Sequence, residues 1–167
     1  MPIIEGAFGL LQYAGTPGSG TAEVQTLTIG GTPTGGTFTL SFEGLTTAAI
    51  TWTATDATLV ASIDSALEAL TNIGTGGVTT AAGTLSAGIG TVTITFATKR
   101  DMGLITASSS LTGTAPTLAV AQTTAGVQPG GIGAPKGALL TDTTNGVLYV
   151  QTGTASSPTW TKVGTQT

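Results

Sequence analysis

The sequence predicts a mainly β protein with an α+β body, in which an antiparallel sheet carries one packed helix. Three observations support this fold class. Apolar and hydroxyl residues alternate through several short segments, as they do in strands with one buried face. Helical periodicity is convincing only between Asp56 and Leu70. Glycine-rich turns punctuate the chain, which has 26 glycines in 167 residues. We also expect an N-terminal extended arm and a small C-terminal three-strand unit.

Residues 1–23 are predicted to form the arm. Their apolar residues follow neither helical nor strand periodicity, and the Gly- and Ser-rich run 15–20 then reads as a flexible linker. The arm either folds back on its own domain or reaches a neighbouring subunit, because exposed apolar residues mark contacts. Its candidate capsid-contact or subunit-contact residues are Ile3, Ile4, Phe8, Leu10, Leu11 and Tyr13.

Residues 24–127 are predicted to form the body. Strands are expected at 24–29, 37–42, 49–54, 78–82 and 91–97, with weaker ones at 104–106 and 117–121. The Gly- and Pro-rich run 30–36 is predicted to be a turn. The second and third strands are predicted to form a hairpin. Alternation turns one set of side chains inward: Phe38, Leu40, Phe42, Ile50, Trp52, Val92, Ile94 and Phe96.

The predicted helix spans 56–70. Its apolar stripe is expected to dock on the sheet, because a lone helix of this length is marginal in water. The stripe consists of Leu59, Ile63, Leu67 and Leu70.

Residues 128–135 are rich in glycine and proline and are predicted to be a linker to a C-terminal β unit at 136–167. In this unit Asn145 and Gly146 lie between two apolar runs. That dipeptide favours a hairpin with a type I′ turn, in which both residues have positive φ. Pro158–Val163 supplies a third strand that carries Trp160.

Composition argues against most enzyme classes, so we expect a protein that is not an enzyme and has no cofactor. The chain has no histidine and no cysteine, which removes the commonest general base, metal ligand and thiol nucleophile. Asp64 and Glu68 lie one helical turn apart, but hard cations need more oxygen ligands than two carboxylates supply, so no metal site is expected. Four basic residues in a chain with a pI near 4.3 do not favour nucleic acid. No apolar run has transmembrane length, so no membrane partner is expected.

Charged residues make up only 7% of the chain, against about 25% in soluble domains. A free monomer with so few charges would be poorly protected against association. We therefore expect much of the surface to lie against other subunits. The N-terminus lacks the positive region of a signal peptide, which argues against export by the general secretory route.

Two segments resemble modules of tailed-bacteriophage virion proteins. Residues 25–44, with 46–50 and the 56–70 helix that ends in Thr71-Asn-Ile-Gly, resemble a small β-rich module of head-decoration, fibre and other structural components. Residues 137–154 and 158–164 resemble a second unit common near the ends of phage structural proteins. The resemblance implies no catalytic residue.

The resemblance implies a virion structural protein. We favour a capsid decoration or cement protein on the capsid surface, made in the host cytoplasm, that binds the major capsid protein lattice and stabilises the head. We expect this protein to be a homo-oligomer that forms trimers at the three-fold axes of the lattice. A tail-tube subunit is disfavoured because long continuous strands are not expected here. The alternative is a head-fibre or tail-fibre protein whose Tyr149 and Trp160 contact host-surface glycan, and a secreted bacterial adhesin comes third.

Overall fold

The computed structural model describes residues 11–13, 20–127, 136–154 and 159–164. The protein is mainly β, with antiparallel sheets and one helix in the described residues. The chain divides into two compact units. The large unit is Thr21–Val127, and the small unit combines residues 1–20 with 128–167. The fold class expected from the sequence is confirmed.

The sheet of the large unit is built around β2, which spans Val24–Phe42. One side of β2 pairs along nearly its whole length with β7 (Thr106–Thr124). The other side pairs first with β6 (Gly90–Phe96) and then with the short strands β4 (Ile50–Thr51) and β3 (Leu45–Thr46). Strand β5 (Val78–Ala82) pairs with β6, and all of these pairings are antiparallel.

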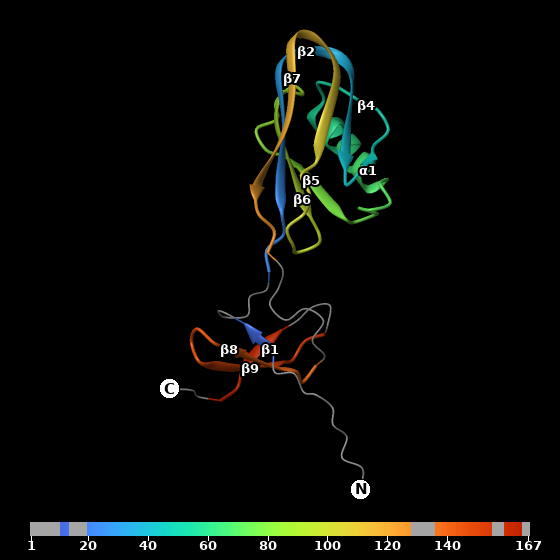
Figure 1. Ribbon diagram of the computed structural model, residues 1–167. Coiled ribbons are helices and arrows are strands. Elements are labelled where there is room, and N and C mark those ends of the chain that lie inside the picture. The colour runs from blue at the N-terminus through green and yellow to red at the C-terminus, as the bar shows by residue number, and fades with distance from the viewer. Residues whose placement is uncertain (1–10, 14–19, 128–135, 155–158, 165–167) are drawn as a thin grey trace. The chain divides into compact units, whose positions relative to one another are not determined.

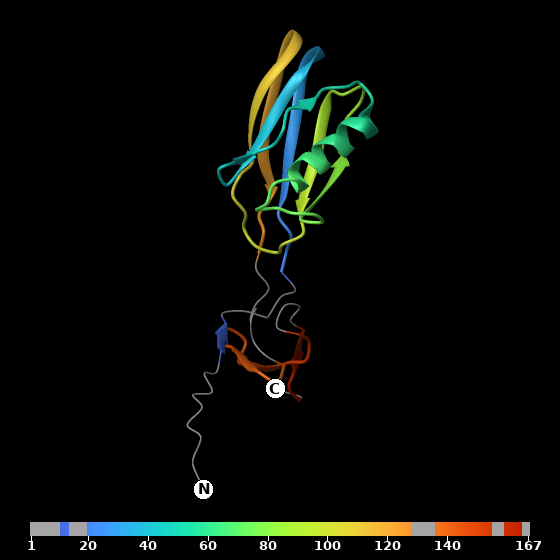
Figure 2. The same ribbon diagram turned by 90° about the vertical axis from the view of Figure 1, so that its right-hand side faces the viewer.

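The predicted turn at 30–36 is wrong, because the chain passes through it inside β2. The pairing register of β2 with β7 shifts between Gly30 and Thr32 and again between Pro33 and Gly35. Gly31 has φ 73°, and a Cβ there would collide with the Ala115 carbonyl oxygen. Figures 1 and 2 show β2 and β7 turning over together at this end of the large unit. Glycine therefore provides a bulged bend rather than a strand end.

Strand β7 also runs through this bend, so it has 19 residues; it contains the predicted strand 117–121 but only the last residue of the predicted strand 104–106. Strand β2 also has 19 residues. The expectation that the body lacks long strands is therefore wrong, and strand length no longer argues against a tail-tube subunit.

Helix α1 spans Asp56–Glu68 and lies across one face of the sheet (Figure 2). Its predicted stripe is buried: Leu59, Ile63 and Leu67 are fully enclosed and Leu70 is nearly so. Thr55 is the N-cap but its side chain makes no capping hydrogen bond. The Asp56 carboxylate instead accepts the Gly88 N–H at 2.7 Å, which ties the start of the helix to the loop before β6.

The stripe packs into the core of the large unit. The inward residues expected from strand alternation are buried there, including Phe38, Leu40, Ile50 and Val92. The Phe42 and Phe96 rings lie 5.2 Å apart between centroids. Trp52 is only half-buried; its indole N–H donates to the Gly88 carbonyl at 2.9 Å while its ring packs against the core.

The small unit is a four-stranded sheet in the order β1-β8-β9-β10. Strands β8 (Leu139–Asp142), β9 (Val147–Gln151) and β10 (Trp160–Lys162) form an antiparallel meander. Strand β1 (Leu11–Tyr13) comes from the predicted arm and pairs in parallel with β8, Leu11 opposite Leu140.

The hairpin at Asn145-Gly146 is present, but the two-residue type I′ turn is wrong. Asp142 pairs with Val147, which leaves four residues in the loop. Of the predicted pair only Gly146 has positive φ, 66°. The buried Asp142 carboxylate explains the wider loop, because it accepts the N–H groups of Thr144 and Asn145 at 2.9 and 3.0 Å. These two hydrogen bonds satisfy backbone N–H groups inside the four-residue loop.

Candidate interaction surfaces

The six candidate contact residues of the N-terminal segment divide into two groups. Ile3, Ile4, Phe8 and Leu10 lie outside the described residues. Leu11 and Tyr13 belong to β1, whose backbone pairs with β8 of the same chain. At least this part of the segment therefore folds back on its own chain, one of the two arrangements that the sequence left open.

The two aromatic residues proposed for host contact are brought together by the register of the small unit. Tyr149 lies opposite Lys162, and Trp160 lies opposite Gln151 on the same pair of strands. Residues directly opposite each other share a face of the sheet, so Tyr149 and Trp160 are diagonal neighbours on one face. Both are half-buried.

Gln151 organises the chain next to these aromatics. Its buried side-chain carbonyl accepts the N–H groups of Gly153 and Thr159 at 3.0 and 2.9 Å, and its amide donates to the Thr154 carbonyl at 3.1 Å. One glutamine side chain thereby holds both ends of the β9–β10 connection, which fixes where β10 and Trp160 begin. The sequence pattern did not single out Gln151, and the burial of β9 shows no alternation that would have marked it.

The helix carboxylates that were weighed as a cation site accept hydrogen bonds from two separate segments. Asp64 accepts both the N–H and the hydroxyl of Thr80 at 3.0 Å, which fastens α1 to β5. Glu68 accepts the Gly76 N–H at 2.6 Å. Within the described ranges no group of three or more His, Cys, Asp or Glu is placed to hold a metal ion.

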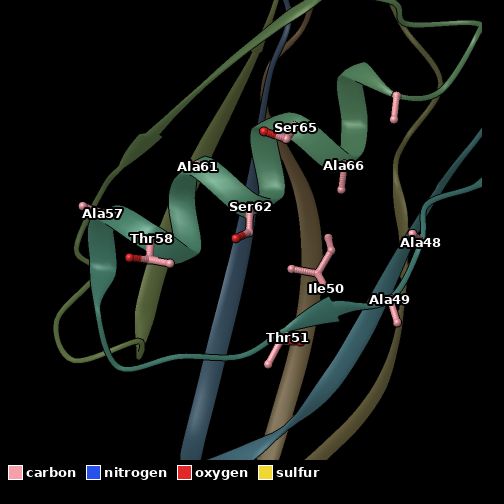
Figure 3. A pocket seen from close by; sticks show the side chains of 11 residues that line it. Ala48, Ala49, Ile50, Thr51, Ala57, Thr58, Ala61, Ser62, Ser65 and Ala66 are labelled. Carbon is pink, nitrogen blue, oxygen red and sulfur yellow. The ribbon is translucent and has the colours of Figure 1, made fainter.

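An open groove runs between α1 and the segment that leads into β4. Its volume is about 850 Å³. Figure 3 shows the exposed side of the helix above it and Ile50 of β4 below. None of its lining residues is charged, and all except Ile50 are small: Ala48, Ala49, Ile50, Thr51, Ala57, Thr58, Ala61, Ser62, Ser65, Ala66 and Ala69. The groove is a neutral surface without the groups that acid–base chemistry requires.

Strand β7 provides a second neutral surface. It pairs with β2 and with no other strand in the part of the chain that the structure describes, so one side of its backbone is a sheet edge. None of its 19 residues is charged. Most of its side chains are exposed, whereas Ala107, Leu111, Leu118 and Val120 pack partly against the core.

A buried carboxylate lies at the start of β2. Glu23 and Gln25 are fully enclosed. Glu23 accepts the Met102 N–H and the Gln25 amide, both at 2.6 Å. Gln25 in turn donates to the Gly103 carbonyl at 2.9 Å and accepts the Ile105 N–H at 2.8 Å. The pair therefore holds the loop that leads into β7.

Burial acts to raise the pKa of Glu23, but hydrogen bonds donated by Met102, Gln25, Gln122 and Gly126 outweigh burial and lower the pKa below its ordinary value. All of these partners are donors, so they favour the ionised carboxylate. No sequence pattern predicted this network. Strand alternation could have indicated it, because Glu23 and Gln25 have the same inward-facing positions in the alternation as the buried Leu27 and Ile29.

Among the residues with described positions, no helix is both long and apolar enough to cross a membrane. No protein-family model matches the sequence, and no curated protein matches it. Among solved structures, a chain of Mycobacterium phage Patience is similar, with a TM-score of 0.41 and 16% sequence identity. The match covers 83% of this chain and 48% of that chain, so this chain spans about half the length of its neighbour. The neighbour comes from a bacteriophage, and a similarity at this level carries no argument about the role of this chain.

Proposed function

We propose that this chain is a structural protein of a tailed-bacteriophage virion, and specifically a capsid decoration or cement protein that binds the major capsid protein. The observation that carries the proposal is the neutral surface of the large unit. The α1–β4 groove and the whole of β7 lack charged residues. Surfaces of this kind are poorly protected against association, which suits a subunit that lies against other proteins. The resemblance of residues 25–50 with the 56–70 helix, and of residues 137–154 and 158–164, to phage modules supports the same role.

Such a protein stabilises a shell by mass action. It binds the assembled lattice and not the dissociated subunits, so it shifts the equilibrium toward the shell. The apolar residues Ile3, Ile4, Phe8 and Leu10 are proposed to make much of this contact, together with Leu11 and Tyr13. The backbone of β1 pairs with β8 of the same chain. A trimer at the lattice three-folds is the assembly that we expect in this role.

The test uses virions that carry the full chain or a chain that lacks residues 1–10. This deletion removes four of the six candidate residues and keeps β1, so the sheet of the small unit stays complete. We measure the copy number of the chain and the melting temperature of the particles. The proposal predicts hundreds of copies per virion, with loss of the chain and a lower melting temperature after the deletion.

A matched control replaces Gln12 by Ser, a polar change inside β1 that leaves all six candidate residues in place. It should keep full occupancy. If the deletion also keeps full occupancy and an unchanged melting temperature, the N-terminal segment is not the anchor. A low copy number in the unmodified virion would contradict the decoration role itself, and cryo-electron microscopy would then show whether the chain lies in the tail or in a fibre.

A fibre protein that contacts host glycan is the second candidate, favoured by the pairing of Tyr149 and Trp160 on one face of the small unit. Aromatic rings on a sheet face offer apolar area with a polar tip, which suits contact with a sugar. Binding of the full chain to a glycan array, lost in the Trp160→Ala variant and kept in the Trp52→Phe variant, would support this role. An array without binding would contradict it.

A further inference from the structure

We infer that the free edge of β7 pairs with β7 of a second copy of this chain, in an antiparallel contact about a two-fold axis through the bend of the strand. This inference goes beyond the proposed function, because it concerns the free chain and needs no capsid, and for the free chain it puts a dimer in place of the trimer named there. It rests on four properties of β7: its open edge, its lack of charge, its bend and its length.

An open edge of this length is unusual in a soluble protein. A strand edge presents unpaired N–H and C=O groups that template the addition of another strand, and natural edges are guarded by lysines, other charges, prolines, β-bulges, short strands or a covering element. Strand β7 has 19 residues and no charged side chain. The guards that it does carry, a β-bulge and Pro116, are confined to the bend, where Gly113 has φ 133° and Ala115 has φ 45°. The two runs on either side of the bend, Thr106–Thr112 and Thr117–Gln122, pair regularly with β2.

The bend determines which partner strand can pair with both runs of β7. Because β2 and β7 turn over together (Figures 1 and 2), a straight strand from another protein would match only one of the two runs. A second copy rotated by 180° about an axis through the bend turns over at the same place. The run Thr106–Thr112 of one copy then lies antiparallel to the run Thr117–Gln122 of the other.

The faces of the two runs fix the register of this contact. Ala107 and Leu111 face the core in the first run, and Leu118 and Val120 face it in the second. Opposite residues of a strand pair share a face, so the core-facing residues must oppose one another. Placing Leu111 opposite Leu118 of the second copy achieves this along both runs. It also places exposed Ser108 opposite Ala121 of the second copy and brings no two charges together.

The length of the strand gives enough area. The register opposes residues 106–123 of the two copies; these 18 residues at about 3.4 Å each span roughly 61 Å, and a sheet layer is about 10 Å thick. Pairing along this length would then bury roughly 1,200 Å² in total, which is at the lower end of the range of about 1,200–2,000 Å² for stable interfaces. Because the same patch is used on both copies, the contact closes on itself and gives a dimer.

The test uses the purified full chain and two double variants. Ser108→Lys with Ala121→Lys puts like charges opposite each other at two places in the contact. Ser108→Lys with Ala121→Glu changes the same exposed positions but puts opposite charges there. We measure molar mass by light scattering after size-exclusion chromatography over a range of concentrations, and we check the fold of each variant by circular dichroism.

The unmodified chain is expected at about 32 kDa, twice its mass of 16.2 kDa. The dissociation constant should rise at least about tenfold in the Lys/Lys variant, because like charges directly opposite each other destabilise a strand pair. The Lys/Glu variant should stay dimeric. A monomeric or trimeric unmodified chain would overturn the inference, and so would equal masses for two folded variants. None of these outcomes depends on virion binding, so they are separate from the test of the decoration role.

Discussion

The buried carboxylate of Glu23 offers the sharpest test of how the large unit is held together. In the Glu23→Gln variant one carboxylate oxygen becomes an NH₂ group. Both oxygens accept hydrogen bonds at 2.6 Å, from the Met102 N–H and the Gln25 amide, so the new NH₂ meets a donor wherever it points. A hydrogen bond to a charged group contributes about 1.5–3 kcal/mol. We therefore expect the free energy of unfolding at pH 7 to fall by about 2–3 kcal/mol.

The pH dependence of stability offers a second test of the same hydrogen bonds. The pKa of Glu23 is lowered in the folded state, so the ionised form stabilises the fold at pH values above the unfolded pKa of about 4.3. That stabilisation is lost as the pH falls through the lower folded pKa. Glutamine does not titrate. The difference in stability between the unmodified chain and the variant should therefore be constant near neutrality and shrink on acidification below about pH 4.

The assay is urea unfolding at several pH values between 3 and 7, followed by Trp52 fluorescence in a background that carries Trp160→Phe. Glu43→Gln is the matched control, since Glu43 is exposed in the turn between β2 and β3. The control should change stability by less than about 0.5 kcal/mol. If Glu23→Gln is as mild as the control at pH 7, or if its effect does not shrink in acid, the hydrogen bonds to Glu23 do not stabilise the fold as argued.

Three further predictions concern the core, the bend and the small unit. Ile63→Ala should lower the free energy of unfolding by about 2–5 kcal/mol in urea titrations, whereas Thr58→Ala on the exposed helix face should have little effect. Gly31→Ala should cost more than Gly44→Ala in thermal melts, because both have positive φ but only Gly31 would also collide with backbone. Asp142→Ala should speed amide exchange at Thr144 and Asn145, since both lose an acceptor, and should leave exchange in β6 unchanged.

Local sequence chemistry was enough for the parts of the fold that depend on periodicity. The leucine and isoleucine stripe of α1 and the alternation at 37–42 and 91–97 each identify an element and its buried face. These patterns arise from the geometry of one helix or one strand, so they are complete within a few neighbouring residues.

The patterns failed where a partner that is not part of the repeating pattern decides the outcome. Glycines at 30–36 are typical of a turn, yet β7 supplies a continuous partner from about 80 residues further along the chain and holds them inside β2. The Asn145-Gly146 dipeptide predicted the hairpin, but the Asp142 carboxylate widened its loop. In both places a partner outside the local pattern provided hydrogen bonds that the pattern did not include.

For the candidate surfaces too, the sequence predicted the chemical groups, and the tertiary structure decided their arrangement. The sequence indicated a chain poor in charge and in reactive side chains, because composition alone decides how many such groups exist. Tyr149 and Trp160 were named from their chemistry, and only the strand register put them on one face.

The sequence by itself therefore determined the β-rich class, the helix, the buried stripes and the neutral character of the surface, all of which follow from local periodicity and composition. Only the tertiary structure decided that β2 and β7 are single bent strands, that β1 joins β8, that Glu23 and Gln25 hold the loop before β7, and that one edge of β7 is open. Each of these depends on pairing between segments far apart in the chain, where the free energy of closing a long loop is balanced by contacts that no local pattern contains.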